Sequence, residues 1–228
     1  MMAAWKGEGG ECVLVTVVGT RGSSYRSPGA RMLILPDGSR IGAVSGGCLE
    51  GELCRRAHWW TSESSAVLKT FDTSTQEDNE GFGLGCGGGI DLLLERLERD
   101  AMLERLERDP MAERLPGEAT ATHPLLAQAH VTESREAGAL AVVLDATTGS
   151  GLRVGERFAR GNAREYPEIG QLLRRCVETG YSFAAELREG TLAGCRLFFE
   201  SLTPPVQLLV CGAGTDAEPV VLQAAALG

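Results

Sequence analysis

The sequence predicts a mixed α/β fold, on three observations. Short runs of β-branched and other apolar residues alternate with segments whose apolar residues recur at helical spacing. Asp37-Gly38 separates two of the apolar runs, which is typical of a β-hairpin. Near the C-terminus a strand pattern, a glycine-rich turn and a helix pattern follow one another. We therefore expect a mixed α+β domain over residues 1–203, followed by a first strand–helix unit over residues 204–228.

The N-terminal region predicts a series of strands around one helix. Its strands are expected over Cys12–Gly19, Arg31–Pro36, Arg40–Val44, Ala66–Phe71 and Ile90–Leu94. The helix is predicted by apolar residues at helical spacing, namely Leu49, Leu53, Ala57 and Trp60. A turn, Ser45-Gly46-Gly47-Cys48, precedes this helix directly.

A repeated segment follows the last of these strands. Leu94–Met102 and Leu103–Met111 read LERLERDAM and LERLERDPM. A shift of nine residues is about two and a half helical turns, so the leucines of the two copies would face opposite sides of one straight helix. A helix packed on a core does not favour that pattern. We expect a solvated, charged helical segment over residues 94–111, the result of a duplication tolerated at the surface.

The C-terminal half predicts alternating helices and strands. Helices are expected over Pro124–Leu140, Ile169–Glu178 and Val220–Leu227, and strands over Ala141–Leu144, Leu152–Arg160, Tyr181–Leu187, Leu192–Glu200 and Val206–Cys211. Thr203-Pro204-Pro205 is typical of a linker.

The composition excludes several classes of protein. The formal net charge is −9 and the pI about 5.0, which argues against non-specific binding to nucleic acid. No apolar run is long enough for a membrane span, and the N-terminus has no signal-peptide pattern. The 7 cysteines include no Cys-x-x-Cys pair. We expect a cytoplasmic protein with free thiols and with neither nucleic acid nor a membrane as partner.

The turn before the last helix resembles a dinucleotide-binding fingerprint. Gly212 would allow a tight turn, and Gly214 would let the backbone approach a pyrophosphate. A Rossmann domain also needs a second strand with an acidic residue about 20 residues further on, which this chain does not contain. We therefore expect a truncated Rossmann unit, whose apolar strand invites pairing with another chain. The alternative is a plain strand–helix turn.

Three further segments carry candidate binding residues. Arg21, Arg26 and Arg31 lie among glycines and serines, a combination suited to a phosphate group, although arginines of a solvated loop give the same pattern. Cys48 precedes the predicted helix, where its thiolate would be favoured as a nucleophile or metal ligand. Ser45, Gly46 and Gly47 would let a flat ligand approach the backbone. Gly85, Cys86 and Gly87 repeat this combination. A small buried cysteine is the alternative at both places.

Together these segments resemble the XdhC/CoxI family, the xanthine dehydrogenase accessory factors. The resemblance is carried by GTRGSSYRSPGARMLILPDGSRIGAVSGGCLE (Gly19–Glu50), GLGCGGGIDLLLE (Gly83–Glu95) and VQLLVCGAGTDAEPVVLQAAALG (Val206–Gly228). It implies a chaperone, not an enzyme, that binds molybdenum cofactor transiently, as molybdopterin or its nucleotide form. It also implies that Cys48 contacts the molybdenum and that Cys86 matches a second family cysteine. The implied partners are a cysteine desulfurase, which sulfurates the cofactor, the large subunit of a molybdenum hydroxylase, and a second copy of the chain.

Two other functions stay open at this point. One is an NAD(P)-dependent oxidoreductase built on the Gly212–Gly214 turn, which the missing acidic strand disfavours. The other is a non-functional truncated product.

Overall fold

The first half of the fold is a five-stranded antiparallel sheet, which we call sheet A. The computed structural model describes residues 11–47, 49–72, 88–97 and 122–227. Sheet A consists of β1 (Cys12–Arg21), β2 (Arg31–Ile34), β3 (Arg40–Gly42), β4 (Ala66–Asp72) and β5 (Gly89–Leu97), in the order β3-β2-β1-β5-β4. Helix α2 (Glu50–Trp60) covers one face, where its Leu53 packs on Val15 and Leu92. Since successive residues of a strand point to opposite faces, alternate residues of β1 and β5 pack beneath α2 and the others lie on the opposite face of sheet A.

A second antiparallel sheet, sheet B, forms the other half of the fold. It consists of β6 (Gly138–Asp145), β7 (Arg157–Phe158), β8 (Phe183–Glu186) and β9 (Arg196–Leu202), in the order β7-β6-β9-β8. Helix α6 (Pro167–Thr179) covers its outer face, with Ile169 and Leu173 packed on Val143 and Phe199. Two short 3-10 turns, η1 (Asn162–Glu165) and η2 (Gly190–Leu192), lie beside β7 and β9 in the chain.

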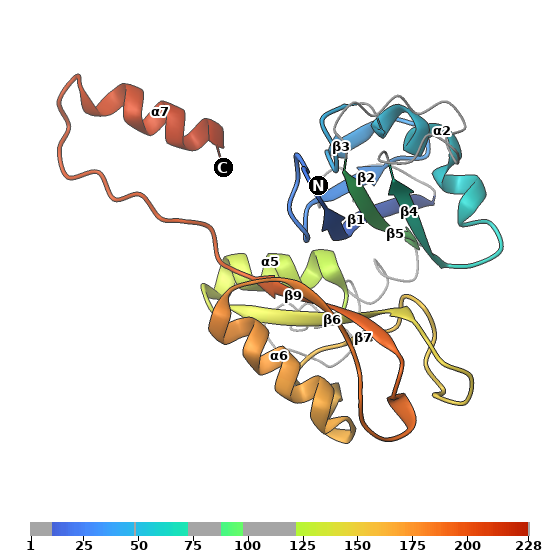
Figure 1. Cartoon of the computed structure of the whole chain (residues 1–228). Helices are drawn as coiled ribbons and strands as arrows, with labels where there is room; N and C mark the ends of the chain where they lie inside the picture. The colour runs from blue at the N-terminus through green and yellow to red at the C-terminus, as the bar shows by residue number, and fades with distance from the viewer. Residues whose placement is uncertain (1–10, 48, 73–87, 98–121, 228) are drawn as a thin grey trace, which may run out of the picture.

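The inner faces of the two sheets pack against each other. Val18 and Leu93 of sheet A form one apolar cluster with Val142 and Phe198 of sheet B. Helix α5 (Pro124–Ser134) fills the space beside this contact, with Leu125 in a cluster with residues of β1 and β2. The layers therefore run from α2 through sheet A and sheet B to α6 (Figure 1).

The C-terminal segment leaves both sheets. Residues 203–216 form neither helix nor strand, and α7 (Ala217–Leu227) lies apart from the rest of the chain (Figure 1). Val206 is 96% exposed in this segment. We call residues 203–227 the C-terminal arm.

The structure confirms the mixed α/β class but corrects several elements. No strand forms over Val206–Cys211, because the described residues offer it no neighbouring strand. The helix that begins at Pro124 ends at Ser134, since Arg135 turns into the left-handed region with φ 62° and β6 follows. The strand expected over Leu152–Arg160 is reduced to β7.

The repeated segment begins as a strand, not as a helix. Leu94 lies in the cluster beneath α2, whereas Glu95 pairs with Arg157. This alternation carries β5 to Leu97. The rest of the repeat, residues 98–111, lies outside the described residues, and the division into domains at residue 203 stays a prediction. No helix in the described part of the chain has the length and apolar character of a membrane span.

Candidate functional site

The turn before α2 is held together by one carboxylate. Glu50 is buried in the first turn of the helix and accepts hydrogen bonds from the backbone N–H groups of Ser45, at 2.7 Å, and Gly47, at 3.0 Å. The Ser45 hydroxyl donates at 2.5 Å to Oε2, the same carboxylate oxygen that accepts from Gly47. Burial by itself would raise the pKa of Glu50, but these hydrogen bonds outweigh it and the pKa lies below its ordinary value. The ionised Glu50 side chain thus serves as the acceptor for the backbone N–H groups of the turn.

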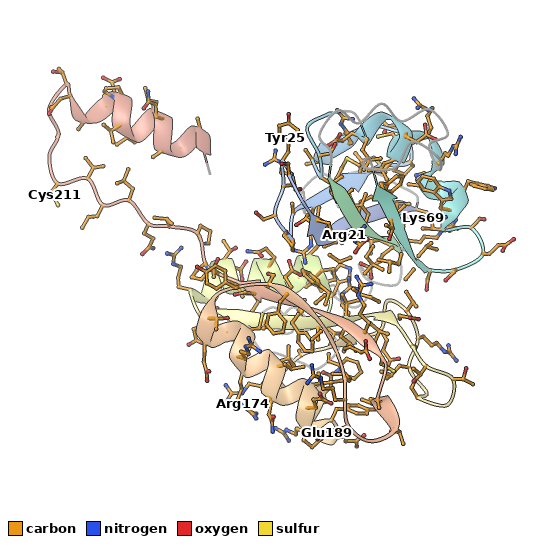
Figure 2. The ribbon with its side chains drawn as sticks, in the orientation of Figure 1. Arg21, Tyr25, Lys69, Arg174, Glu189 and Cys211 are labelled. Atoms are coloured by element: carbon orange, nitrogen blue, oxygen red, sulfur yellow. The ribbon has the colours of Figure 1, made fainter. Side chains whose placement is uncertain are left out.

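The outer surface of this turn carries an exposed aromatic ring. A Cβ added to Gly46 would lie 3.0 Å from Cδ2 of Tyr25, so the ring packs directly on the glycine. The Tyr25 residue is nevertheless 74% exposed (Figure 2). Gly47 has φ +115°, which side chains rarely adopt. Glycines at these two positions therefore permit a flat, exposed surface next to the loop of Arg21 and Arg26.

Arg21 is held at the end of β1 by Asp91. Its Nη1 donates to both carboxylate oxygens of Asp91, at 3.1 and 3.2 Å. Arg196 of β9 donates to the same carboxylate at 3.1 Å, and Thr70 donates at 2.7 Å. Burial acts to raise the pKa of Asp91, but the hydrogen bonds from Thr70 and Arg21 and the arginine charge keep it below its ordinary value. Asp91 is therefore an ionised acceptor shared by both sheets.

The described end of the second glycine cluster lies against the same loop. A Cβ added to Gly88 would lie 2.3 Å from the backbone oxygen of Ser23. Only glycine permits this approach without a shift of the backbone. The structure thus brings the Gly88 end of the cluster, the Arg21–Tyr25 loop and the Ser45–Gly47 turn into one neighbourhood.

The three arginines of the predicted phosphate site do not lie together. Arg31 is only 10% exposed and its Nη2 pairs with Glu200 of β9 at 2.5 Å, so it is removed from the surface. This pairing disfavours a contact between Arg31 and a bound phosphate, which stays a prediction. Arg26 lies in the exposed loop, where its backbone carbonyl accepts a hydrogen bond from Ser24.

Several predicted site residues lie outside the described residues or far from the turn. Cys48, Gly85, Cys86 and Gly87 belong to the first group. In the described part of the chain no three His, Cys, Asp or Glu side chains could hold a metal ion together. Gly212, with φ +146°, and Gly214 lie in the exposed C-terminal arm, where no strand leads into their turn.

Sequence reasoning missed several residues of this neighbourhood, among them Glu50, Tyr25, Asp91 and Arg196. The acidic position in the first turn of α2 was a signal for Glu50, because carboxylates are favoured there. An aromatic residue inside the small-residue run GSSYRS was a signal for Tyr25. Arg196 had no signal, since only the packing of sheet B on sheet A brings it to Asp91.

Comparisons with known proteins point to one family. The model of the XdhC and CoxI family matches residues 5–72. A Bacillus subtilis protein named as a probable subunit of xanthine dehydrogenase is 37% identical over 91 residues, which are 40% of this chain and 28% of that protein. The Escherichia coli "Molybdenum cofactor insertion chaperone PaoD" is 38% identical over 86 residues, 37% of this chain and 26% of that protein. The matched segment thus spans about a quarter of each relative.

A solved structure shares the fold over a longer stretch. A Bacillus halodurans protein described as a xanthine dehydrogenase has a TM-score of 0.61, covering 100% of this chain and 59% of its own, at 24% identity. The resemblance predicted from the motifs is therefore confirmed over residues 5–72, which match the model of the XdhC and CoxI family.

Proposed function

We propose that this chain is a chaperone for molybdenum cofactor and not an enzyme. It binds the cofactor transiently, as molybdopterin or its nucleotide form, and protects it. It also assists sulfuration by a cysteine desulfurase and delivers the cofactor to the large subunit of a xanthine dehydrogenase or related molybdenum hydroxylase. The family match over residues 5–72 and a relative named as a cofactor insertion chaperone support this proposal. We place the protein in the cytoplasm, as a homodimer.

The observation that carries the proposal is the exposed Tyr25 ring on the Gly46 surface. A pterin is flat and aromatic, so one of its faces can stack on a tyrosine ring. Because Gly46 has no Cβ, the Tyr25 ring lies directly on the turn and the rest of the ring stays exposed to a planar ligand. Arg21 and Arg26 supply guanidinium groups for the cofactor's phosphate on the same loop.

The cysteines complete the proposed site. Cys48 follows Gly47 directly in the sequence and is proposed as the ligand of molybdenum, whose sulfur-rich coordination suits a soft thiolate. Gly85, Cys86 and Gly87 are proposed as a second contact, since Gly88 lies against the Ser23 backbone. The Gly212–Gly214 turn stays a predicted phosphate turn. An NAD(P)-dependent oxidoreductase gains no support, because no described strand precedes that turn.

The test is the amount of pterin that copurifies with the protein. We expect protein from a molybdenum-replete host to release a pterin that fluoresces after oxidation, and Cys48→Ala to release less. Absence of pterin from the wild type would overturn the proposal. Equal amounts in both would remove Cys48 as a ligand but leave the function intact.

Tyr25→Ala tests the stacking contact in the same assay. Stacking of a base on an aromatic side chain contributes about 1–3 kcal/mol, so we expect pterin retention to weaken about fivefold or more. Tyr181→Ala is the matched control, because Tyr181 is also strongly exposed but follows α6, on the outer face of sheet B. Similar retention in both variants would exclude stacking on Tyr25.

A further inference from the structure

Asp91 gathers two arginines that come from different sheets. Arg21 reaches it from the end of β1 and Arg196 from the start of β9. Both guanidinium groups donate to the same oxygen, Oδ2, at 3.1 Å. The two cationic groups therefore lie close together at the junction of sheets A and B.

This group of three side chains carries an excess of positive charge. One carboxylate balances only one of the two guanidinium groups, which leaves a net charge of +1 in a chain whose net charge is −9. Asp91 is 5% exposed, but the side chains of Arg21 and Arg196 are 50% and 40% exposed. The buried part of this group, Asp91, is thus anionic, and the part that faces solvent, the two arginines, is cationic.

Each arginine keeps donors for a second acceptor. Arg21 uses only Nη1 and Arg196 only Nη2 in their bonds to Asp91. A guanidinium has five N–H donors in a fixed fork, which fits a tetrahedral oxyanion. Because Asp91 fixes both guanidinium groups before a ligand arrives, little side-chain entropy remains to be lost on binding.

We infer that Arg21 and Arg196 form a binding site for a phosphate group, assembled only when sheet B packs on sheet A. Its ligand class is a phosphate monoester or a pyrophosphate. This inference rests on the proposed function for the identity of the ligand, since the site continues the loop of Tyr25 and Arg26. In this site Arg196 takes the place that the sequence analysis gave to Arg31, because Arg31 is paired with Glu200. The phosphate thereby binds both sheets at once.

Glu186 limits the strength of this site. It is the register partner of Arg196 on the neighbouring strand β8, so both side chains leave the same face of sheet B. Its negative charge opposes an incoming oxyanion. Removal of this charge will therefore strengthen binding, an effect that a merely destabilised variant cannot produce.

The test is calorimetric titration of the full chain with inorganic pyrophosphate and with inorganic phosphate at low ionic strength. We expect Arg196→Gln to weaken pyrophosphate binding about tenfold or more, because hydrogen bonds to charged groups are lost. Glu186→Gln should tighten it. Arg174→Gln is the control, because Arg174 lies on α6 at the far side of sheet B (Figure 2). We expect this variant to bind pyrophosphate as the wild type does.

The outcomes test the phosphate site separately from the proposed chaperone function. Unchanged pyrophosphate binding by Arg196→Gln, or weaker binding by Glu186→Gln, overturns the phosphate site even if the protein carries pterin. Binding that depends on Arg196 in a protein without pterin supports the site and contradicts the proposed function. Tighter binding of pyrophosphate than of phosphate assigns the site to the nucleotide form of the cofactor, and the reverse order assigns it to molybdopterin.

Discussion

At the residue scale, Glu50 joins the glycine turn to the core. Its carboxylate is buried beside Val44 and accepts hydrogen bonds from the backbone on both sides of Gly46. The turn is therefore held in this shape without a ligand, with Gly46 against the Tyr25 ring. A preformed surface of this kind lowers the cost of ordering the site when a ligand binds.

Glu50→Gln tests this role. Backbone N–H groups donate to both carboxylate oxygens, so an amide NH₂ in place of either oxygen leaves at least one N–H group without its acceptor. We expect the free energy of unfolding to fall by about 1–3 kcal/mol in urea denaturation. Since the folded pKa of Glu50 lies below its ordinary value of 4.5, the stabilisation is present above pH 4.5 and is lost as the pH falls through the folded pKa.

Glu63→Gln is the matched control for that variant. Glu63 is exposed in the turn after α2, and we expect its substitution to leave the unfolding free energy almost unchanged. A Glu50→Gln protein as stable as this control would show that Glu50 does not hold the turn.

At the element scale, local patterns predicted the strands and helices that pack on one core. β1 and α2 were located within two residues, because their apolar residues follow the period of the element. The pattern failed where tertiary contacts decide. Glu95 resembled part of a solvated helix, but Arg157, far along the chain, neutralises it inside the fold. The strand expected at Val206 had the right composition and lacked a partner.

The candidate site shows the same division. Its loops were predictable, because glycines and arginines next to turns are visible in the sequence. The ion-pair partners of Arg21 and Arg31 were not predictable, since each partner is an acidic residue of another strand. A charged residue can be assigned to a ligand only after its partners within the fold are known.

Helix α5 carries a pH-dependent cap. His123 precedes the helix, and its Nδ1 accepts a hydrogen bond from the backbone N–H of Leu125 at 3.3 Å. Burial, together with the charges of Arg157 and Arg31, lowers the pKa of His123 from 6.5 to about 3. The folded state therefore keeps this histidine neutral where the unfolded chain takes up a proton.

The stabilisation of the fold by neutral His123 is complete above pH 6.5. It decreases as the pH falls toward about 3, by up to about 1.4 kcal/mol per pH unit, because only the unfolded chain takes up the proton. We expect His123→Asn, which retains an N-cap acceptor, to lose less stability than the wild type between pH 6.5 and pH 4.5. Chemical denaturation at a series of pH values measures this. His130→Asn, at an exposed histidine of the same helix, should retain the wild-type slope; an unchanged slope in His123→Asn would contradict the assignment.

At the scale of the whole molecule, ion pairs cross the contact between the sheets. Arg31 of β2 meets Glu200 of β9, and Glu95 of β5 meets Arg157 of β7. Burial raises the pKa of Glu200 in spite of the charges of Arg31 and Arg157. Together with the Asp91 group, these pairs join sheet B to sheet A. The alignment of the sheets in turn places Arg196 beside Arg21.

The Glu95–Arg157 pair tests how strongly this alignment is specified. Both side chains are largely buried, so Arg157→Leu leaves an uncompensated carboxylate between the sheets. We expect a loss of about 3–5 kcal/mol in the free energy of unfolding, against almost none for Arg164→Leu at an exposed arginine. The double variant Glu95→Leu/Arg157→Leu removes both charges and should recover most of that loss, because apolar side chains replace buried ion pairs at little cost.

Pyrophosphate titration of the double variant then separates the effect of the ion pair on stability from its effect on the alignment of the two sheets. Wild-type affinity would mean that apolar packing alone positions Arg196, whereas a stable protein with weakened binding would mean that the ion pair sets the register of the two sheets.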